Sequence, residues 1–376
     1  MSLLLENLSV SPDFNLLYEK IRTGSRLSKE DGLKLYESND ILSIAALADF
    51  ARINRLKDAE QLKKIDYVYW INNHHLNITN ICEGKCKFCA YRRQEGQDGA
   101  FLYPLDEAKM HIEKNISKDI KEIHIVSALN PKCDLDYYVN LLGYCKEVLP
   151  NAHIQAFTAV EIDYLSKISG TDIEKVLLEL KNAGLGSLPG GGAELFSPEI
   201  RAKVCPEKIS GESWLNIMKT AHGLGLKSNA TMLTGIGESC EDKLDHMLAL
   251  REAQDETGGF MTFIPLICYY ENTEIDRQED ATGFDIIKDY AISRIMLDNF
   301  PHIKSFWIQA GIKLAQISLC AGVDDLDGTV IEEKITRFAG ARTGQALSKD
   351  ELINLIRKAG KIPVERDTVY NIIKVY

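Results

Sequence analysis

Short apolar segments with strand character alternate with amphipathic helical segments through most of the chain. Strands are predicted at about eight places, which are residues 67–77, 122–128, 153–158, 185–188, 227–233, 260–268, 304–309 and 323–330. Helical periodicity fills the intervals between nearly all of them. Parallel neighbours require crossover connections, so this alternation predicts a parallel sheet. Eight such units indicate an α/β fold, a closed (β/α)8 barrel of the TIM type, with an open doubly wound sheet as the alternative.

Helical segments are predicted on both sides of the barrel. Apolar residues recur at helical spacing in 15–21 and 33–53, and Ser28 is placed to cap the second of these helices. The active site of a barrel lies in the loops after the strands, so functional residues are expected there. The sequence thus divides into a helical extension at 1–66, the barrel at 67–331, and a mostly helical tail at 332–376 that packs on the barrel and has a short strand near Ile362.

The net charge, the apolar stretches and the cysteine count together indicate where the protein works and which partners are excluded. With 44 Lys and Arg against 55 Asp and Glu the net charge is −11, which argues against a nucleic-acid partner. The first residues lack a signal-peptide pattern, and no stretch approaches the roughly 18 apolar residues of a membrane span. We therefore expect a cytoplasmic protein with no membrane partner. Nine cysteines, an odd number, then favour metal ligands or buried thiols over disulfides.

Three cysteines lie close together in the loop after the first barrel strand. Cys82, Cys86 and Cys89 have the spacing C-x3-C-x2-C. Three thiolates can bind three irons of a 4Fe–4S cluster, which leaves the fourth iron open to a small molecule. The alternative is a zinc site with His74 or His75 as its fourth ligand. The remaining cysteines are scattered, and we expect most of them to be small buried hydrophobes.

The motif Cys82-x3-Cys86-x-Phe88-Cys89 resembles the cluster loop of the radical S-adenosylmethionine (SAM) enzymes. The resemblance implies one 4Fe–4S cluster per chain, held by the three cysteines, and SAM as a co-substrate bound at the open iron. It also implies that an electron from the cluster cleaves SAM and releases a 5′-deoxyadenosyl radical. A low-potential donor such as a flavodoxin or ferredoxin would supply that electron. Phe88 resembles the family residue that lies beside the adenine.

The likeness extends from about Tyr69 to Tyr370 and is greatest for the menaquinone (futalosine) pathway branch of this family. Within that branch the sequence most resembles the aminofutalosine synthases, through segments such as 157–161, 188–194 and 324–330. Residues 189–194 are shared with the sister cyclase, and 324–330 favours the synthase. The implied reaction adds the deoxyadenosyl C5′ to the enol ether of 3-[(1-carboxyvinyl)oxy]benzoate. Rearrangement and decarboxylation then give 6-amino-6-deoxyfutalosine. The alternatives are a cyclic dehypoxanthine futalosine synthase, a deazaflavin-synthase-like enzyme, and a non-enzymatic iron–sulfur or zinc protein.

Two further loops and one strand end are expected to contact SAM. Gly190, Gly191 and Gly192 follow a short strand, and glycines let the backbone approach a ligand closely. Glu161 starts a helix after a strand and, by resemblance, accepts hydrogen bonds from the ribose hydroxyls. Ser127 ends the second strand and is placed at the methionyl end of SAM, where relatives usually carry a glycine.

The implied substrate has two carboxylates, so its pocket needs cations or hydrogen-bond donors. We expect Arg201 and Arg251 to bind it, with His75 orienting the substrate or moving a proton. Other residues of the same types are weaker candidates: Lys208, Arg294, Lys334, His74, His222 and His246.

Overall fold

Seven parallel strands form one curled sheet at the centre of the molecule. The computed structural model describes residues 12–376 except 57, 277, 278 and 345. The strands are hydrogen-bonded in chain order, each parallel to the next. They are β2 (Asn73–Leu76), β3 (Glu122–Ile125), β4 (His153–Ala156), β5 (Leu185–Leu188), β6 (Lys227–Thr234), β7 (Phe260–Ile267) and β8 (His302–Ile303).

An eighth strand joins the two ends of this sheet. β9 (Asp325–Gly328) meets the end of β8 through a bridge between Lys304 and Asp325. On its other side β9 pairs in parallel with β1 (Tyr67–Ile71), which runs directly into β2. The segment predicted as one strand at 67–77 therefore pairs with β9 through β1 and with β3 through β2, and the predicted α/β barrel is confirmed.

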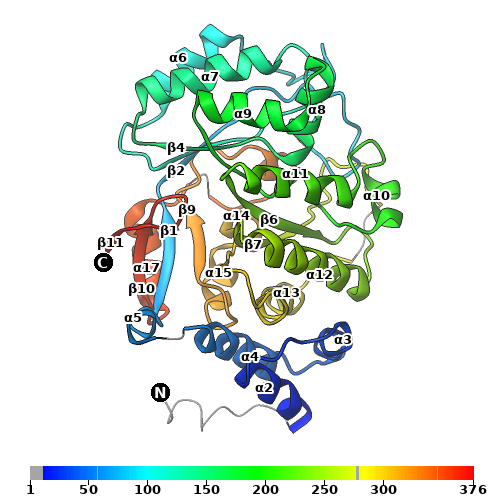
Figure 1. The fold of residues 1–376 in the computed structure, drawn as a ribbon, viewed down its shortest axis with the longest axis vertical. Coiled ribbons are helices and arrows are strands. Elements are labelled where there is room, and N and C mark those ends of the chain that lie inside the picture. Colours follow the sequence, from blue (N-terminus) through cyan, green and yellow to red (C-terminus); the bar gives the residue numbers. More distant parts are fainter. Residues whose placement is uncertain (1–11, 57, 277–278, 345) are drawn as a thin grey trace.

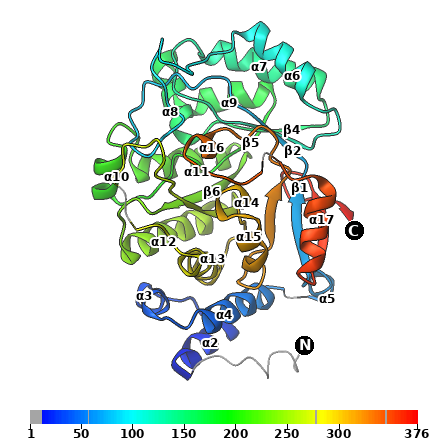
Figure 2. The same ribbon diagram turned by 180° about the vertical axis from the view of Figure 1, so that it is seen from behind.

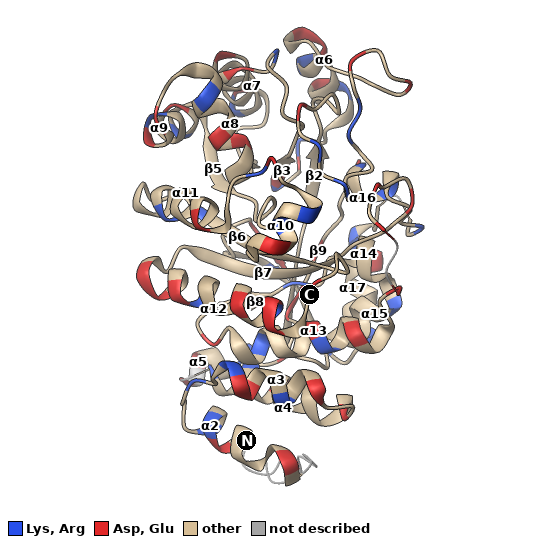
Figure 3. Ribbon diagram, turned by 90° about the vertical axis from the view of Figure 1, so that its right-hand side faces the viewer, with Lys and Arg blue, Asp and Glu red and all other residues tan. Residues whose placement is uncertain are grey.

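Helices cover the outside of the sheet, as Figure 1 shows. Acidic and basic residues are interspersed along these helices (Figure 3). Among the described residues, no helix combines the length and the apolar character that crossing a membrane requires. The covering helices are α6 (Leu105–Asn115), α7 (Leu135–Val148), α8 (Ala159–Ser169), α9 (Ile173–Ala183), α10 (Pro198–Val204), α11 (Gly211–Gly223), α12 (Cys240–Thr257), α13 (Gly283–Met296), α14 (Trp307–Ala310) and α15 (Ile312–Ser318).

The N-terminal segment is helical and packs against the barrel helices α12 and α13. It consists of a 3-10 turn at Pro12–Phe14 and helices α2 (Asn15–Arg22), α3 (Lys29–Glu37), α4 (Ile41–Asn54) and α5 (Ala59–Leu62). The predicted cap at Ser28 is confirmed, because its side chain accepts the Asp31 N–H while Asp31 accepts the Ser28 N–H. Residues 1–11 of the predicted extension lie outside the described residues.

The C-terminal segment differs from the mostly helical tail that we expected. It contains the short helices α16 (Ile335–Phe338) and α17 (Lys349–Lys358) and two strands, β10 (Ile362–Arg366) and β11 (Ile372–Val375). β10 lies parallel to β1, and β11 is antiparallel to β10, at one side of the barrel (Figures 1 and 2). A buried ion pair of 2.7 Å between Arg366 and Asp325 fastens this segment to β9. The partner of β10 lies about three hundred residues earlier in the chain, so local periodicity gives no sign of the pairing.

Candidate active site

A cavity of about 380 Å³ lies at the carboxyl ends of the barrel strands. Its volume is within the range of small-molecule sites. The loops after β2, β3, β4, β5 and β7 all contribute to its wall. Most of the predicted site residues line this one cavity: His75, Cys82, Cys86, Phe88, Cys89, Ser127, Glu161, Gly190, Gly191 and Gly192.

Backbone hydrogen bonds from three other parts of the chain hold the cysteine loop. The Cys82 N–H donates to the carbonyl of Arg93, and a tight turn joins the Cys89 N–H to the Cys86 carbonyl at 3.1 Å. Between them, the Lys87 N–H donates to Val204 at the end of α10, and the Lys87 carbonyl accepts from Glu274 after β7. These contacts do not use the thiols. The Cys82 sulfur also accepts the Leu129 N–H at 3.4 Å, a hydrogen bond that a metal-bound thiolate can keep.

The spacing of the three sulfurs fits a cluster better than a single zinc ion. Bonds of about 2.3 Å at tetrahedral angles would place zinc-bound sulfurs about 3.8 Å apart. The three thiol sulfurs do not all lie within 4.8 Å of one another. Among the described residues, the ligand atoms that do form such a group belong to His74, His111 and Glu332. A cubane cluster binds each thiolate at a different iron and therefore accommodates more widely separated sulfurs.

The residues proposed as a fourth zinc ligand lie against other side chains. His75 stacks on His124 with 4.5 Å between ring centroids, and His74 faces Glu332 at 3.6 Å. Burial raises the pKa of the Cys82, Cys86 and Cys89 thiols, while the nearby Lys208 ammonium lowers it. A half-buried set of three thiols beside a cation is suited to a metal centre that stabilises the thiolates.

Phe88 lies on the same loop and is partly covered by a charged pair. The Lys208 ammonium is 5.1 Å from the centroid of the Phe88 ring and forms an ion pair with Glu194. Both charged residues line the cavity. A ligand that stacks on the free part of this ring would therefore also meet a cation and a carboxylate.

Glu161 and Ser127, which were predicted separately, contact each other. One carboxylate oxygen of Glu161 accepts the Ser127 N–H at 2.9 Å, and the other accepts the N–H and the hydroxyl of Thr158, each at 2.8 Å. The Ser127 hydroxyl accepts the Thr79 N–H in the segment that leads to the cysteine loop. Glu161 thus caps α8 and also joins the ends of β3 and β4. Burial raises the pKa of Glu161 to about 7.

Exchanging Glu161 for Gln should change how stability depends on pH. The unfolded chain releases this proton near pH 4.5 and the folded chain near pH 7, so the folded form binds more protons between these values. The free energy of unfolding of the wild-type protein should therefore fall as pH rises from about 4.5 to 7, and level off above pH 7. The total decrease should be about 3 kcal/mol. Urea titrations of the apo-protein from pH 5 to 8 would show this trend as the difference between wild type and Glu161→Gln. A constant difference would contradict it.

Two of the three glycines permit close packing, Gly190 against β6 and Gly192 against the start of α8. A Cβ on Gly190 would lie 2.7 Å from the backbone of Ala230 and 2.8 Å from the Thr231 nitrogen. Gly192 has a φ of +81°, and its Cβ would meet Val160 at 2.6 Å. Close packing therefore explains why glycine is needed at positions 190 and 192. Contact of these glycines with SAM remains a prediction.

Gly190→Ala should destabilise the fold because its new methyl group would meet backbone atoms that cannot rotate away. Overpacking of this kind costs about 1–3 kcal/mol, and we expect the upper end of that range. Gly191→Ala is the matched control, since its Cβ would meet only the Thr158 methyl at 3.0 Å. Chemical unfolding curves should place the Gly190 variant well below the Gly191 variant. Equal midpoints would show that the β5–β6 spacing can adjust.

The structure does not place Arg201 or Arg251 at the cavity. Arg201 is buried and donates to the carbonyls of Ala193, Leu195 and Ile209, which holds the segment after the glycines. Arg251 donates to Leu27 and Met296 between α12, α13 and the N-terminal extension. Both guanidinium groups satisfy buried carbonyls, a role that a count of cations in the sequence does not reveal.

Most of the weaker candidates also have partners elsewhere. Arg294 pairs with Asp324 on the far side of the barrel, and the Lys334 ammonium lies over the rings of Phe101 and Tyr103. His222 bonds to Thr257 and Ser228, and His246 to the Thr231 carbonyl. Of this group, Lys208 alone lines the cavity.

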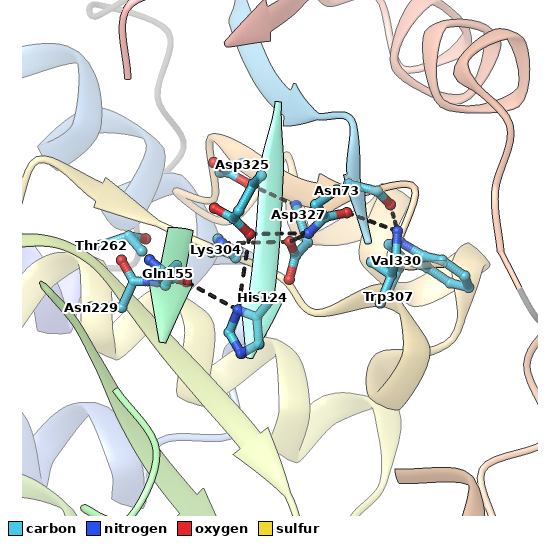
Figure 4. A network of polar contacts seen from close by, with 12 residues as sticks. Asn73, His124, Gln155, Asn229, Thr262, Lys304, Trp307, Asp325, Asp327 and Val330 are labelled. Carbon is cyan, nitrogen blue, oxygen red and sulfur yellow. Dashed lines mark hydrogen bonds and ion pairs between the residues drawn. The ribbon is translucent and has the colours of Figure 1, made fainter. Parts of the chain in front are cut away.

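Sequence reasoning missed a polar network on the inner face of the barrel. His124 contacts Gln155 at 3.1 Å, and Asn229 donates to the same Gln155 oxygen at 3.3 Å (Figure 4). Lys304, at the end of β8, forms an ion pair of 3.5 Å with Asp327. All five residues line the cavity. The available signal was polar side chains at inward positions of otherwise apolar strands, as at Asn229 in β6.

This network supplies a buried cation and two histidines held neutral. Burial lowers the pKa of His75 and His124, and the nearby Lys304 charge lowers both further. The Lys304 side chain is only 7% exposed, and Asp327 is its acidic partner. The deep end of the cavity can therefore bind a carboxylate at Lys304 and donate or accept hydrogen bonds through the amides and imidazoles.

Comparison with known proteins agrees with this geometry. Residues 76–250 match the model of the radical SAM superfamily, and residues 257–376 match the CofH/MqnC C-terminal region. The aminodeoxyfutalosine synthase of Thermus thermophilus is 42% identical over 95% of both chains, and that of Streptomyces coelicolor is 40% identical over 96% of this chain and 94% of its own.

A relative with a different named activity and a solved structure are also similar to this chain. The cyclic dehypoxanthine futalosine synthase of Halalkalibacterium halodurans is 35% identical over 96% of this chain and 95% of its own. The crystal structure of methylornithine synthase superposes with a TM-score of 0.72 over 92% of this chain and 97% of that one, at 16% identity, which supports the fold alone. Since near-full-length relatives share 40–42% of its residues, this chain belongs to the radical SAM superfamily.

Proposed function

We propose that the chain is an aminodeoxyfutalosine synthase. It would join SAM to 3-[(1-carboxyvinyl)oxy]benzoate and water, giving 6-amino-6-deoxyfutalosine, methionine and bicarbonate. The observation that carries this proposal is the 40–42% identity, over nearly the whole chain, with two synthases of that name. SAM is consumed in the reaction, so the enzyme is a transferase.

Cys82, Cys86 and Cys89 would hold one 4Fe–4S cluster at the mouth of the cavity. Such a cluster supplies the electron that splits SAM into methionine and a 5′-deoxyadenosyl radical. The residues proposed to position SAM are Phe88 on the cysteine loop, Ser127 and Glu161 across the cavity, and the glycines 190–192. The joined ends of β3 and β4, through the Ser127 to Glu161 hydrogen bond of 2.9 Å, support a fixed position for the ribose.

The deep polar network would position the benzoate substrate. Lys304 is a buried cation with one acidic partner, so a substrate carboxylate can share its hydrogen bonds. His75 and His124 stack beside it and provide hydrogen-bonding groups without a further charge. We therefore propose that the substrate lies between this network and the proposed SAM site.

The reaction also requires a reductant from outside the chain. We propose a low-potential donor such as a flavodoxin or ferredoxin, and a cytoplasmic location in which free thiols persist. The described cysteines form no disulfide, and five of them line the cavity, including Cys82, Cys86 and Cys89. A reducing environment is the one in which such thiols remain available as ligands.

An anaerobic turnover experiment tests the function directly. The reconstituted, reduced protein would be mixed with SAM and 3-[(1-carboxyvinyl)oxy]benzoate, and the products identified by mass. We expect 6-amino-6-deoxyfutalosine and methionine in equal amounts. Release of 5′-deoxyadenosine with no adduct would reject the synthase. Conversion of dehypoxanthine futalosine in a parallel assay would assign the cyclase activity instead.

A further inference from the structure

Two histidines and a glutamate converge on the outer side of the barrel, away from the cavity. They are His74 on β2, His111 on α6 and Glu332 in the segment between β9 and α16. Their ligand atoms all lie within 4.8 Å of one another. None of the three lines the cavity described above. The group therefore brings together the first barrel strand, its following helix and the C-terminal segment.

One member of this group is buried without a hydrogen-bond partner. The His74 side chain is only 2% exposed, and its Nε2 atom has no hydrogen bond. That atom faces Glu332, but the separation of 3.6 Å is too long for a hydrogen bond. An unsatisfied polar atom in such a position costs about 1–3 kcal/mol. A bound cation would give this nitrogen a partner.

The distances suit a single ion bound to all three side chains. Zinc bonds of about 2.0–2.1 Å to nitrogen and oxygen, at tetrahedral angles, place neighbouring ligand atoms about 3.3 Å apart. The observed separations from the Glu332 oxygen are 3.0 Å to His111 and 3.6 Å to His74, on either side of that value. A small movement of Glu332, whose side chain is 31% exposed, would equalise them.

We propose that His74, His111 and Glu332 bind one divalent cation of the zinc class. Two imidazoles and one carboxylate favour Zn²⁺, Co²⁺ or Ni²⁺ over Mg²⁺ and Ca²⁺, which prefer sets of oxygen ligands. A water molecule can occupy the remaining position on the exposed side of Glu332. The Asn115 amide lies 3.1 Å from the second ring nitrogen of His111, and with its oxygen turned toward this nitrogen it would accept the Nδ1–H and leave Nε2 free to bind the ion.

The surroundings predict a structural site of moderate affinity. The Lys334 ammonium adds a positive charge near the group, although the rings of Phe101 and Tyr103 lie beneath it. Since the three ligands come from β2, α6 and the C-terminal segment, the ion would hold these elements together. β2 leads into the cysteine loop, so the ion would also steady the base of that loop.

Metal analysis of the reconstituted holoenzyme tests the proposal. The protein would be dialysed against a mild chelator, loaded with Zn²⁺ and washed, and its metals counted. We expect one zinc per chain with the iron content unchanged. Zinc K-edge absorption should show only nitrogen and oxygen neighbours at about 2.0–2.1 Å. A sulfur shell at about 2.3 Å would place the zinc on cysteines and overturn the proposal, as would a chain that retains no zinc.

Variants at the two more exposed ligands identify the site. His111→Ala and Glu332→Gln should weaken zinc binding by at least 100-fold. The matched control is Glu107→Gln, which removes the same charge from the exposed face of α6 one turn before His111. Zinc should raise the melting temperature of wild type and of this control, and leave that of His111→Ala unchanged. Equal zinc affinity in all four proteins would overturn the proposal. Unchanged iron content in every variant would show that each one is folded.

Discussion

Replacing Cys86 with Ala should give a folded protein that cannot hold a complete cluster and has no synthase activity. The loop keeps its shape through backbone hydrogen bonds at Cys82, Lys87 and Cys89, so loss of one sulfur should leave the fold intact. A cluster bound by three thiolates has no spare protein ligand when one is removed. Anaerobic reconstitution should therefore give well below the four irons per chain of wild type, with loss of the brown colour.

An exposed cysteine outside the cavity provides the control for this result. Cys320 lies at the end of α15 and does not line the cavity, so Cys320→Ala should retain full iron and activity. Circular dichroism should give the same helix content for both variants. Full iron loading and turnover in Cys86→Ala would contradict the assignment of the ligands. A colourless wild-type protein with one zinc would instead support the zinc scaffold.

Replacing Lys304 with Met should reduce kcat/KM for the benzoate substrate by about 30- to 5,000-fold. Loss of one partner from a buried, hydrogen-bonded charge pair costs about 2–5 kcal/mol, and the change leaves a substrate carboxylate without its cation. Lys304 forms its ion pair with Asp327 and belongs to a different loop from the three cysteines, so iron content should be unchanged. Cleavage of SAM should persist, with 5′-deoxyadenosine replacing part of the adduct.

Two further variants separate the missing cation from its structural effects. Lys304→Met also leaves Asp327 without its cationic partner. Burial already raises the pKa of Asp327. Adding Asp327→Asn removes that carboxylate, and the loss of kcat/KM should remain in the double variant. Lys227→Met is the control for the substitution itself, because Lys227 is exposed at the amino end of β6. An unchanged kcat/KM in Lys304→Met would exclude Lys304 from substrate binding.

The features predicted correctly depend on residues that are near one another in the sequence. The alternation of strands and helices fixes parallel pairing between successive units, so the barrel follows from local patterns. The Ser28 cap and the spacing of Cys82, Cys86 and Cys89 are also local. The sequence does not decide between a zinc ion and a 4Fe–4S cluster, since the spacing of cysteines along the chain does not give the distances between their sulfur atoms.

The features missed depend on partners that are distant in the sequence. Arg201 and Arg251 are cations in the right number for two carboxylates, but buried carbonyls elsewhere in the fold engage both. The sequence predicts a strand at 304–309, but β8 ends at Ile303, and only barrel closure brings Lys304 to Asp327. The same limit applies to β10, whose pairing with β1 no local pattern shows.

That pairing has a consequence for synthesis of the protein. Tyr67 lies opposite Ile362, so 362 − 67 = 295 residues must follow β1 before its neighbour exists. At about 5–20 residues per second, a ribosome needs roughly 15–60 seconds to make them. During this interval the strand that leads to Cys82 has an open edge. Iron insertion should therefore follow release of the finished chain, and nascent chains halted before residue 362 should be cut readily by protease near residue 67.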